Sequence, residues 1–301
     1  MRDATVHQVP TAYELRGALH VARLLPPTGT RRQDLHLAYR GLPRAGAFHI
    51  LDLEHAEQRL VAWGLAEMNG EWITPTIQLQ ELATDDDAGA CENLAIEALA
   101  TASPTWLGAA VTGNGVANEL LPDLVTTRLT SAFPDPDRRE AILLAAARIA
   151  NDTQRRVIGA AGEELVVAEA RAELLRLGRD DLAEQVCRLS ERSDQLGYDV
   201  RAPRLPGGVW RIEVKSSSRH RLALEFFISR AEAETGRRLR EWILTMCHVP
   251  LAGGASVVGW CRYDTIHPLL PRDAHDRGTW QTARIRAHPG LFKPGLPPLD
   301  A

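Results

Sequence analysis

Two strand-like segments joined by a turn constrain this chain of 301 residues more than any other feature. The second segment, residues 209–215, alternates apolar and polar side chains, which is the period of a strand with one buried face. A loop rich in proline and glycine precedes it, and such a loop cannot continue a central strand. Residues 197–200 come before the loop, so we predict an antiparallel hairpin centred near Pro206.

The predicted hairpin brings two acidic side chains together. With the turn at Pro206, Asp199 falls opposite Glu213, and carboxylates facing each other across two strands repel. A divalent cation between them would remove the repulsion, because hard cations prefer carboxylate oxygens. Lys215 lies two residues after Glu213 and therefore shares its face of the strand. This combination is typical of a metal-dependent phosphodiesterase.

Lysine usage favours a special role for Lys215. The chain has 35 basic residues, of which only Lys215 and Lys293 are lysines. Lysine is a compact ammonium that can lie beside a water and a phosphoryl oxygen, whereas arginine is a planar fork. A lysine at this position of an arginine-biased chain indicates that an amine is needed there.

Four short motifs follow one another in the second half of the chain. They are Gly162-Glu163, Gly197-Tyr198-Asp199-Val200, Ile212-Glu213-Val214-Lys215 and Phe227-Ile228-Ser229-Arg230-Ala231-Glu232. The series resembles the PD-(D/E)XK nuclease superfamily and, within it, the carboxy-terminal domain named after the plant protein NO VEIN. The resemblance covers roughly residues 155–262. Tyr198 stands where the superfamily usually has proline, a departure that the NO VEIN type tolerates.

The resemblance implies an α/β fold, with a restriction-endonuclease-like mixed central sheet flanked by helices. It also implies a catalytic set of Glu163, Asp199, Glu213 and Lys215. Asp199, Glu213 and the backbone carbonyl of Val214 would hold Mg²⁺, or Mn²⁺ in its place, and Glu163 would join them directly or through a water. Lys215 would orient the attacking water. The expected activity is endonucleolytic cleavage of DNA that leaves 5′-phosphate ends.

Several of these residues have a structural alternative. Glu163 lies in the first turn of a predicted helix over residues 162–177, where an acid also stabilises the helix dipole, and Glu164 competes for the same role. Ser229 and Glu232 form the pattern of a helix capping box. We expect Glu232 to face the site only because of its place in the family series.

Candidate phosphate contacts follow on the next helix, at Arg237 and Arg238. The alternative for both is a solvated helix face. Residues 1–150 carry a net charge of −7 and the remainder +3, so the asymmetry permits DNA contact without predicting it.

The first part of the chain resembles a winged helix-turn-helix. Three helices are predicted over residues 11–25, 31–42 and 51–63. A hairpin then turns at Asn69-Gly70, a strong local signal for this motif. Arg31 and Arg32 are candidate phosphate contacts, and DNA is the expected partner. The alternative is a helical packing or protein-docking domain whose arginines are solvated.

We predict four segments along the chain. A winged-helix-like domain occupies residues 1–84, a helical connector 85–154, the nuclease-like domain 155–263 and an irregular tail 264–301. Further helices are predicted over residues 88–102, 135–150 and 180–195. Further strands are predicted over residues 222–228, 242–249 and 256–263.

Composition favours a cytoplasmic protein with no membrane contact. No apolar run approaches 18 residues, and the N-terminus lacks the apolar region of a signal peptide. The four cysteines are far apart and form no C-x-x-C pair, so we expect reduced, buried thiols.

The expected biological setting is restriction or defence against foreign DNA, with repair as the runner-up, and it rests on analogy. A homodimer is expected if both strands are cut by one site per chain. The alternative function is a catalytically silent DNA- or protein-binding module, such as a winged-helix regulator.

Overall fold

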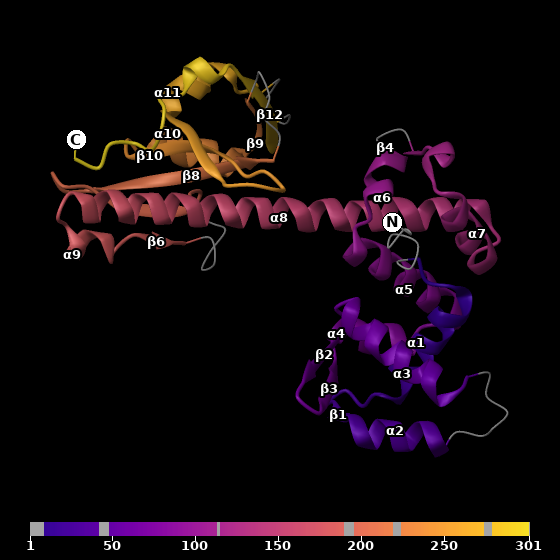
Figure 1. The fold of residues 1–301 in the computed structure, drawn as a ribbon. Coiled ribbons are helices and arrows are strands. Elements are labelled where there is room, and N and C mark those ends of the chain that lie inside the picture. The colour runs from indigo at the N-terminus through magenta and orange to yellow at the C-terminus, as the bar shows by residue number, and fades with distance from the viewer. Residues whose placement is uncertain are drawn as a thin grey trace. The chain divides into compact units, whose positions relative to one another are not determined.

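The computed structural model describes residues 9–41, 48–112, 115–189, 196–218, 224–273 and 279–300 (Figure 1). The chain divides into two compact units, Met1–Thr153 and Gln154–Ala301. Each unit has buried hydrophobic clusters of its own, and each is described by itself.

The first unit starts with three helices and a small sheet. In order these are α1 (Ala12–Leu24), β1 (Thr30–Arg31), α2 (Arg32–Gly41), α3 (Ile50–Ala62), β2 (Ala66–Asn69) and β3 (Trp72–Pro75), with the strands arranged β1-β3-β2. The capping box of Thr11 and Glu14 begins α1, since the Glu14 amide donates to Thr11 Oγ1 at 3.2 Å. The three predicted helices and the hairpin are confirmed, although Arg31 belongs to a strand.

Short helices complete this unit. They are α4 (Ile77–Thr84), α5 (Asp87–Ala102), α6 (Thr105–Ala110) and α7 (Asp123–Ala132), with the strands β4 (Val111–Thr112) and β5 (Gly115–Val116) and the 3-10 helix η2 (Asn118–Leu120). Asp86 caps α5 by accepting from the amides of Ala88 and Gly89, both at 3.0 Å. Leucines from α1, α3, α4 and α5 make up much of the core.

A single helix, α8 (Pro136–Arg176), runs where two helices were predicted. The predicted break between residues 150 and 162 was wrong. That stretch contains no proline, and its one glycine, Gly159, costs only about 1 kcal/mol in a helix. Early residues of α8 such as Ile142 belong to the core of the first unit, and later ones such as Val166 belong to the core of the second.

The second unit is built on a five-stranded mixed sheet in the order β11-β10-β8-β7-β6. Its strands are β6 (Cys187–Arg188), β7 (Val200–Pro203), β8 (Val209–Ser217), β10 (Trp242–His248) and β11 (Ser256–Arg262). Strands β8 and β10 are parallel, joined by a connection that contains α10 (Arg230–Arg238), and the other neighbours are antiparallel. The end of α8 packs with one set of strand side chains and α10 with another, and the two helices lie on different sides of the sheet (Figure 1). The predicted α/β class with a mixed sheet is confirmed.

Two predictions about the edges of this unit were wrong. The helix expected over 180–195 is only α9 (Asp180–Ala183), followed by β6; residues 190–195 lie outside the described ranges. The strand β9 (Leu224–Ser229) pairs with β12 (Thr282–Ala287) in a separate sheet instead of the central one. Both departures depend on pairing between distant segments, which local patterns do not report.

The C-terminal segment is part of the fold and was wrongly predicted to be irregular. In β12 buried and exposed positions alternate, and Lys293 pairs with Trp260 of β11 through the backbone. Leu299 is only 2% exposed and belongs to the core of this unit. The short helices α11 (Tyr263–Ile266), η3 (His267–Leu269) and η4 (Pro289–Leu291) complete the chain.

No helix within the described ranges has the length and apolar composition needed to span a bilayer. All four cysteines carry free thiols. Cys247 and Cys261 are buried, as predicted, whereas Cys91 and Cys187 are half-buried.

Candidate active site

The hairpin of β7 and β8 has the register that the sequence predicts. Val200 pairs with Ile212, so Asp199 and Glu213 occupy the next opposed positions on the two antiparallel strands. The backbone fixes Asp199 firmly, because its amide donates to Ile212 at 2.9 Å and its carbonyl accepts from Leu189 at 2.7 Å. The two predicted metal-binding carboxylates are therefore neighbours across the strands.

The side chain of Asp199 is directed at the backbone of β8. Its Oδ2 accepts from the amide of Val214 at 2.8 Å. In an extended strand the N–H and C=O of one residue point to the same side. The carbonyl of Val214 therefore points toward the Asp199 side of the strand, where the predicted ligand role requires it.

Lys215 joins two carboxylates. Its Nζ lies 2.7 Å from Glu213 Oε1 and 2.9 Å from Glu232 Oε2. The side chain of Glu213 is only 4% exposed and that of Lys215 18%. A buried ion pair of this kind is stable only because each charge has a close partner.

The sequence predicts that Glu232 caps a helix and, with less support, that it faces the site. In the structure Glu232 does both. The Ser229 amide donates to Glu232 Oε2 at 3.0 Å, and the Glu232 amide donates to Ser229 Oγ at 3.2 Å, which completes the capping box of α10. The same Oε2 accepts from Lys215. The place of Glu232 in the ordered motif series was the signal for this contact.

Glu163 is held by an arginine that sequence reasoning missed. Its Oε2 lies 2.7 Å from Arg188 Nε, and a second nitrogen of Arg188 lies 3.4 Å from Glu164 Oε1. The side chain of Glu163 is 14% exposed and that of Glu164 71%, and the charge of Glu163 acts on Asp199. Glu163 is therefore the acid of this helix that belongs to the site. Only the pairing of β6 with β7 places Arg188 here, and no local pattern reveals that pairing.

Burial sets the protonation of the two central carboxyls. Desolvation raises the pKa of Asp199 to about 6, with the charge of Glu163 adding to the shift and the Val214 amide opposing it. Desolvation also raises the pKa of Glu213 to about 8, against the attraction of Lys215. Burial lowers the pKa of Lys215, but Glu213 and Glu232 outweigh that effect and the net direction is upward. Lys215 therefore stays an ammonium, while Asp199 and Glu213 bind protons more readily than free carboxyls do, and a cation would compete with those protons.

The oxygen donors fit a cation that needs few protein ligands. Within the described ranges, no three His, Cys, Asp or Glu side chains are placed to hold a metal ion together. Lys215 lies between Glu213 and Glu232, and Arg188 holds Glu163. The donors that could hold a cation are the carboxylates of Asp199 and Glu213, the second of which is also paired with Lys215, and the carbonyl of Val214. This set suits Mg²⁺, which keeps several waters and takes one or two carboxylates from the protein.

The predicted nucleic-acid contacts are divided between the two units. Arg237 and Arg238 are both exposed on the last turn of α10, and Arg237 lines a pocket. Arg31 is exposed in β1. Arg32 donates to the fully buried carboxylate of Glu57 at 2.6 Å, which gives it a structural role. Phosphate contact by these arginines stays a prediction.

A family model matches the part of the chain that contains the whole cluster. Residues 162–252 match the model described as Protein NO VEIN, C-terminal. This stretch is similar to the NO VEIN C-terminal domain. It begins at Gly162 and includes Glu163, Asp199, Glu213, Lys215 and Glu232, so the predicted NO VEIN resemblance is confirmed over less than a third of the chain. No curated protein and no solved structure matches the chain.

Proposed function

We propose that the second unit is a metal-dependent endonuclease of the PD-(D/E)XK type that hydrolyses DNA. One observation carries the proposal: Asp199 and Glu213 are neighbours at one hairpin, with the ammonium of Lys215 2.7 Å from Glu213 on the same strand. A mixed sheet flanked by helices is also the architecture that the superfamily resemblance implies.

The chain's own residues would act on a phosphodiester, whose negative charge repels nucleophiles. Asp199, Glu213 and the Val214 carbonyl would hold Mg²⁺, which supplies positive charge at a phosphoryl oxygen and an acidified water. Lys215 would orient the attacking water and stabilise the charge that develops on the phosphoryl group. The water oxygen would bond to phosphorus and lose a proton while the bond to the 3′ oxygen breaks; the 3′ oxygen takes up a proton, so the products are a 5′-phosphate and a 3′-hydroxyl.

Glu232 and Arg188 would position the groups that act. If Glu213 binds a metal ion, Glu232 would still hold Lys215 in place, because the capping box fixes the Glu232 side chain. Arg188 fixes Glu163 beside Asp199. These contacts would hold the site in order in the absence of substrate, as an efficient electrostatic site requires.

We assign the first unit a winged-helix fold on the order of its elements: helix, strand, two helices and two strands. The net charge of −7 over residues 1–150 and the pairing of Arg32 with Glu57 favour docking to protein over docking to DNA. By analogy, the setting is restriction or defence against foreign DNA, with repair as the alternative, and cutting both strands favours a homodimer.

A second candidate is a catalytically silent binding module. It is favoured by the fact that the charges of the cluster are already partnered: Lys215 by two carboxylates and Glu163 by Arg188. Such a cluster is electrostatically satisfied without a cation, as a purely structural charge network is.

A cleavage assay separates the two candidates. Supercoiled, linear and modified DNA are incubated with Mg²⁺, with Mn²⁺ and with EDTA, using wild type, Asp199→Asn and Glu213→Gln. Glu164→Gln is the matched control, since Glu164 is an exposed acid of the same unit. We expect cleavage that needs metal, falls at least about 100-fold in the two site variants and persists in the control. Wild type that binds DNA but cuts none of these substrates would establish the silent module instead.

A further inference from the structure

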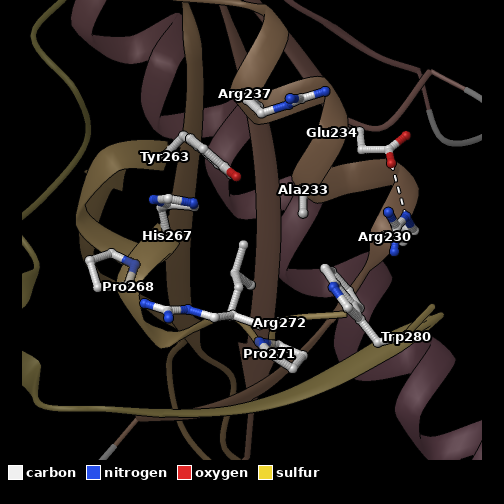
Figure 2. Close-up of a pocket in the computed structure, with 11 residues that line it drawn as sticks. Arg230, Ala233, Glu234, Arg237, Tyr263, His267, Pro268, Pro271, Arg272 and Trp280 are labelled. Atoms are coloured by element: carbon white, nitrogen blue, oxygen red, sulfur yellow. Dashed lines mark hydrogen bonds and ion pairs between the residues drawn. The ribbon is translucent and has the colours of Figure 1, made fainter. Parts of the chain in front are cut away.

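A pocket lies on the second unit beside α10, outside the carboxylate cluster (Figure 2). Its volume is about 270 Å³. One face of α10 contributes four residues at helical spacing, Arg230, Ala233, Glu234 and Arg237. Glu232, which binds Lys215, lies on a different face of the same helix. The pocket and the cluster are therefore separated by about one helix diameter, roughly 10 Å.

Two arginines give the pocket its charge. Arg237 and Arg272 line opposite ends (Figure 2), and both are exposed. Neither has a hydrogen bond or an ion pair with another described residue. The acid in the lining, Glu234, is neutralised by Arg230, whose Nε lies 2.9 Å away. A guanidinium group at each end of one small cavity suits the successive phosphates of a strand, which arginine binds through paired hydrogen bonds.

An aromatic wall completes the pocket and is held in place. Arg230 lies 5.8 Å above the ring of Trp280 and pairs with Asp273 at 2.8 Å. Asp273 in turn accepts from the backbone amide of Trp280 at 3.3 Å. Tyr263 stands on the other side, with its hydroxyl directed into the pocket (Figure 2). A fixed indole beside a hydroxyl that can hydrogen-bond is the kind of surface on which nucleobases stack.

The geometry points to a binding pocket for a single nucleotide of the substrate strand, close to the bond that is cut. The base stacks on Trp280, and the phosphates on its two sides along the strand bind Arg237 at one end of the pocket and Arg272 at the other. The volume lies below the range of about 300–1,000 Å³ for drug-sized ligands, so the pocket takes one nucleotide and excludes longer segments. This inference rests on the proposed function, because it assumes that the substrate is a DNA strand.

The test measures binding without cleavage. A short fluorescein-labelled single-stranded oligonucleotide is titrated by anisotropy in EDTA, with all substitutions made in full-length Asp199→Asn protein. Trp280→Ala should weaken binding about ten-fold, as the loss of one stacked base does, and Trp280→Phe should restore most of it. The pair Arg237→Gln and Arg272→Gln should weaken binding at least as much. Arg286→Gln, an exposed arginine outside the lining, should stay within about two-fold.

Competition identifies the ligand chemistry. Deoxyadenosine monophosphate should displace the oligonucleotide from the parent protein, and inorganic phosphate at the same concentration should not. Unchanged binding in the tryptophan and double-arginine variants overturns the proposal. Equal competition by inorganic phosphate or by a phosphopeptide does so too, because the base would then contribute nothing. Thermal unfolding of each variant shows that a loss of binding is not a loss of fold.

Failure of the pocket and failure of the nuclease give different results. If wild type cuts DNA and the pocket variants bind like the parent, the pocket proposal is rejected and the nuclease proposal stands. If the protein cuts no substrate, but binding is lost in Trp280→Ala and kept in Arg286→Gln, the nuclease proposal is rejected and the nucleotide pocket stands.

Discussion

Two buried carboxyls of the cluster are costly to ionise in the folded protein, and a bound cation would lower that cost. Asp199 and Glu213 are buried and adjacent, and burial raises the pKa of each, to about 6 and about 8. Their unfolded values lie near 4. The folded state therefore binds more protons than the unfolded state between about pH 4 and pH 8, and stability falls as pH rises through that window.

Asp199→Asn should stabilise the metal-free protein at pH 8. Its amide oxygen can still accept from the Val214 amide, while the buried charge is gone. The pKa shift from 3.8 to about 6 corresponds to a gain on the order of 3 kcal/mol, or several degrees in Tm. Calorimetric unfolding at pH 8 and pH 4 measures it. The gain should shrink at pH 4, and a lower Tm at pH 8 would contradict the assignment.

Glu232→Gln should separate the two roles of Glu232. Glutamine also serves in a capping box, so α10 should keep its start, and stability should change by less than about 1 kcal/mol. Lys215 loses one of its two charge partners, its pKa falls, and cleavage should drop about ten-fold with an altered pH–rate profile.

Ser229→Ala is the matched control for this change. It removes the hydroxyl that accepts from the Glu232 amide and should cost about 1 kcal/mol of stability. Its cleavage rate and pH profile should stay close to those of wild type. Equal losses of activity in both variants would reduce Glu232 to a capping residue.

At the scale of elements, local signals predicted the hairpin that carries the site, and long-range pairing escaped them. The Pro/Gly loop and the period-2 pattern of residues 209–215 fixed the register of Asp199 against Glu213. Nothing local distinguishes β6 from a continued helix, so Arg188 was missed. The pairing of β9 with β12 joins segments some fifty residues apart. The second of these strands, β12, is rich in arginine and lies in the segment that the sequence predicted to be irregular.

Gly162 was predicted only as part of a motif, and the structure shows why glycine is needed. A Cβ there would lie 1.9 Å from Ser216 Oγ, 3.1 Å from Ser216 Cβ and 3.4 Å from Cys247 Cβ. Rotation of Ser216 could move the hydroxyl away, but the Ser216 Cβ contact remains. The close approach of α8 to β8 and β10 therefore depends on this glycine.

Gly162→Ala should destabilise the second unit by about 1–3 kcal/mol, the usual cost of overpacking. Gly159→Ala in the same helix meets nothing within 4 Å and should stabilise by up to about 1 kcal/mol, because alanine favours helix. Urea unfolding of the two variants measures the difference. Equal stability of both would mean that the helix does not approach the sheet this closely.

At the scale of the whole molecule, two units with separate cores should respond differently to metal. A ligand that binds only the folded second unit stabilises that unit by about 2.7 kcal/mol at a hundred times its Kd. We expect Mg²⁺ to raise one calorimetric transition and to leave the other unchanged. The effect should weaken at pH 5, where protons compete for Asp199 and Glu213, and vanish in Asp199→Asn. A uniform shift of both transitions would indicate nonspecific salt effects.

The most direct test of the nuclease assignment uses the two lysines of the chain. Supercoiled plasmid is incubated with Mg²⁺ and wild type, Lys215→Ala or Lys293→Ala, and the nicked product is measured over time. Lys293 lies over the ring of Trp260, so its loss removes the same charge and side chain at a place without proposed chemistry. We predict nicking by wild type and Lys293→Ala and a loss of at least about 100-fold in Lys215→Ala. Equal nicking by all three proteins, or none by any, would contradict a nuclease that works through Lys215.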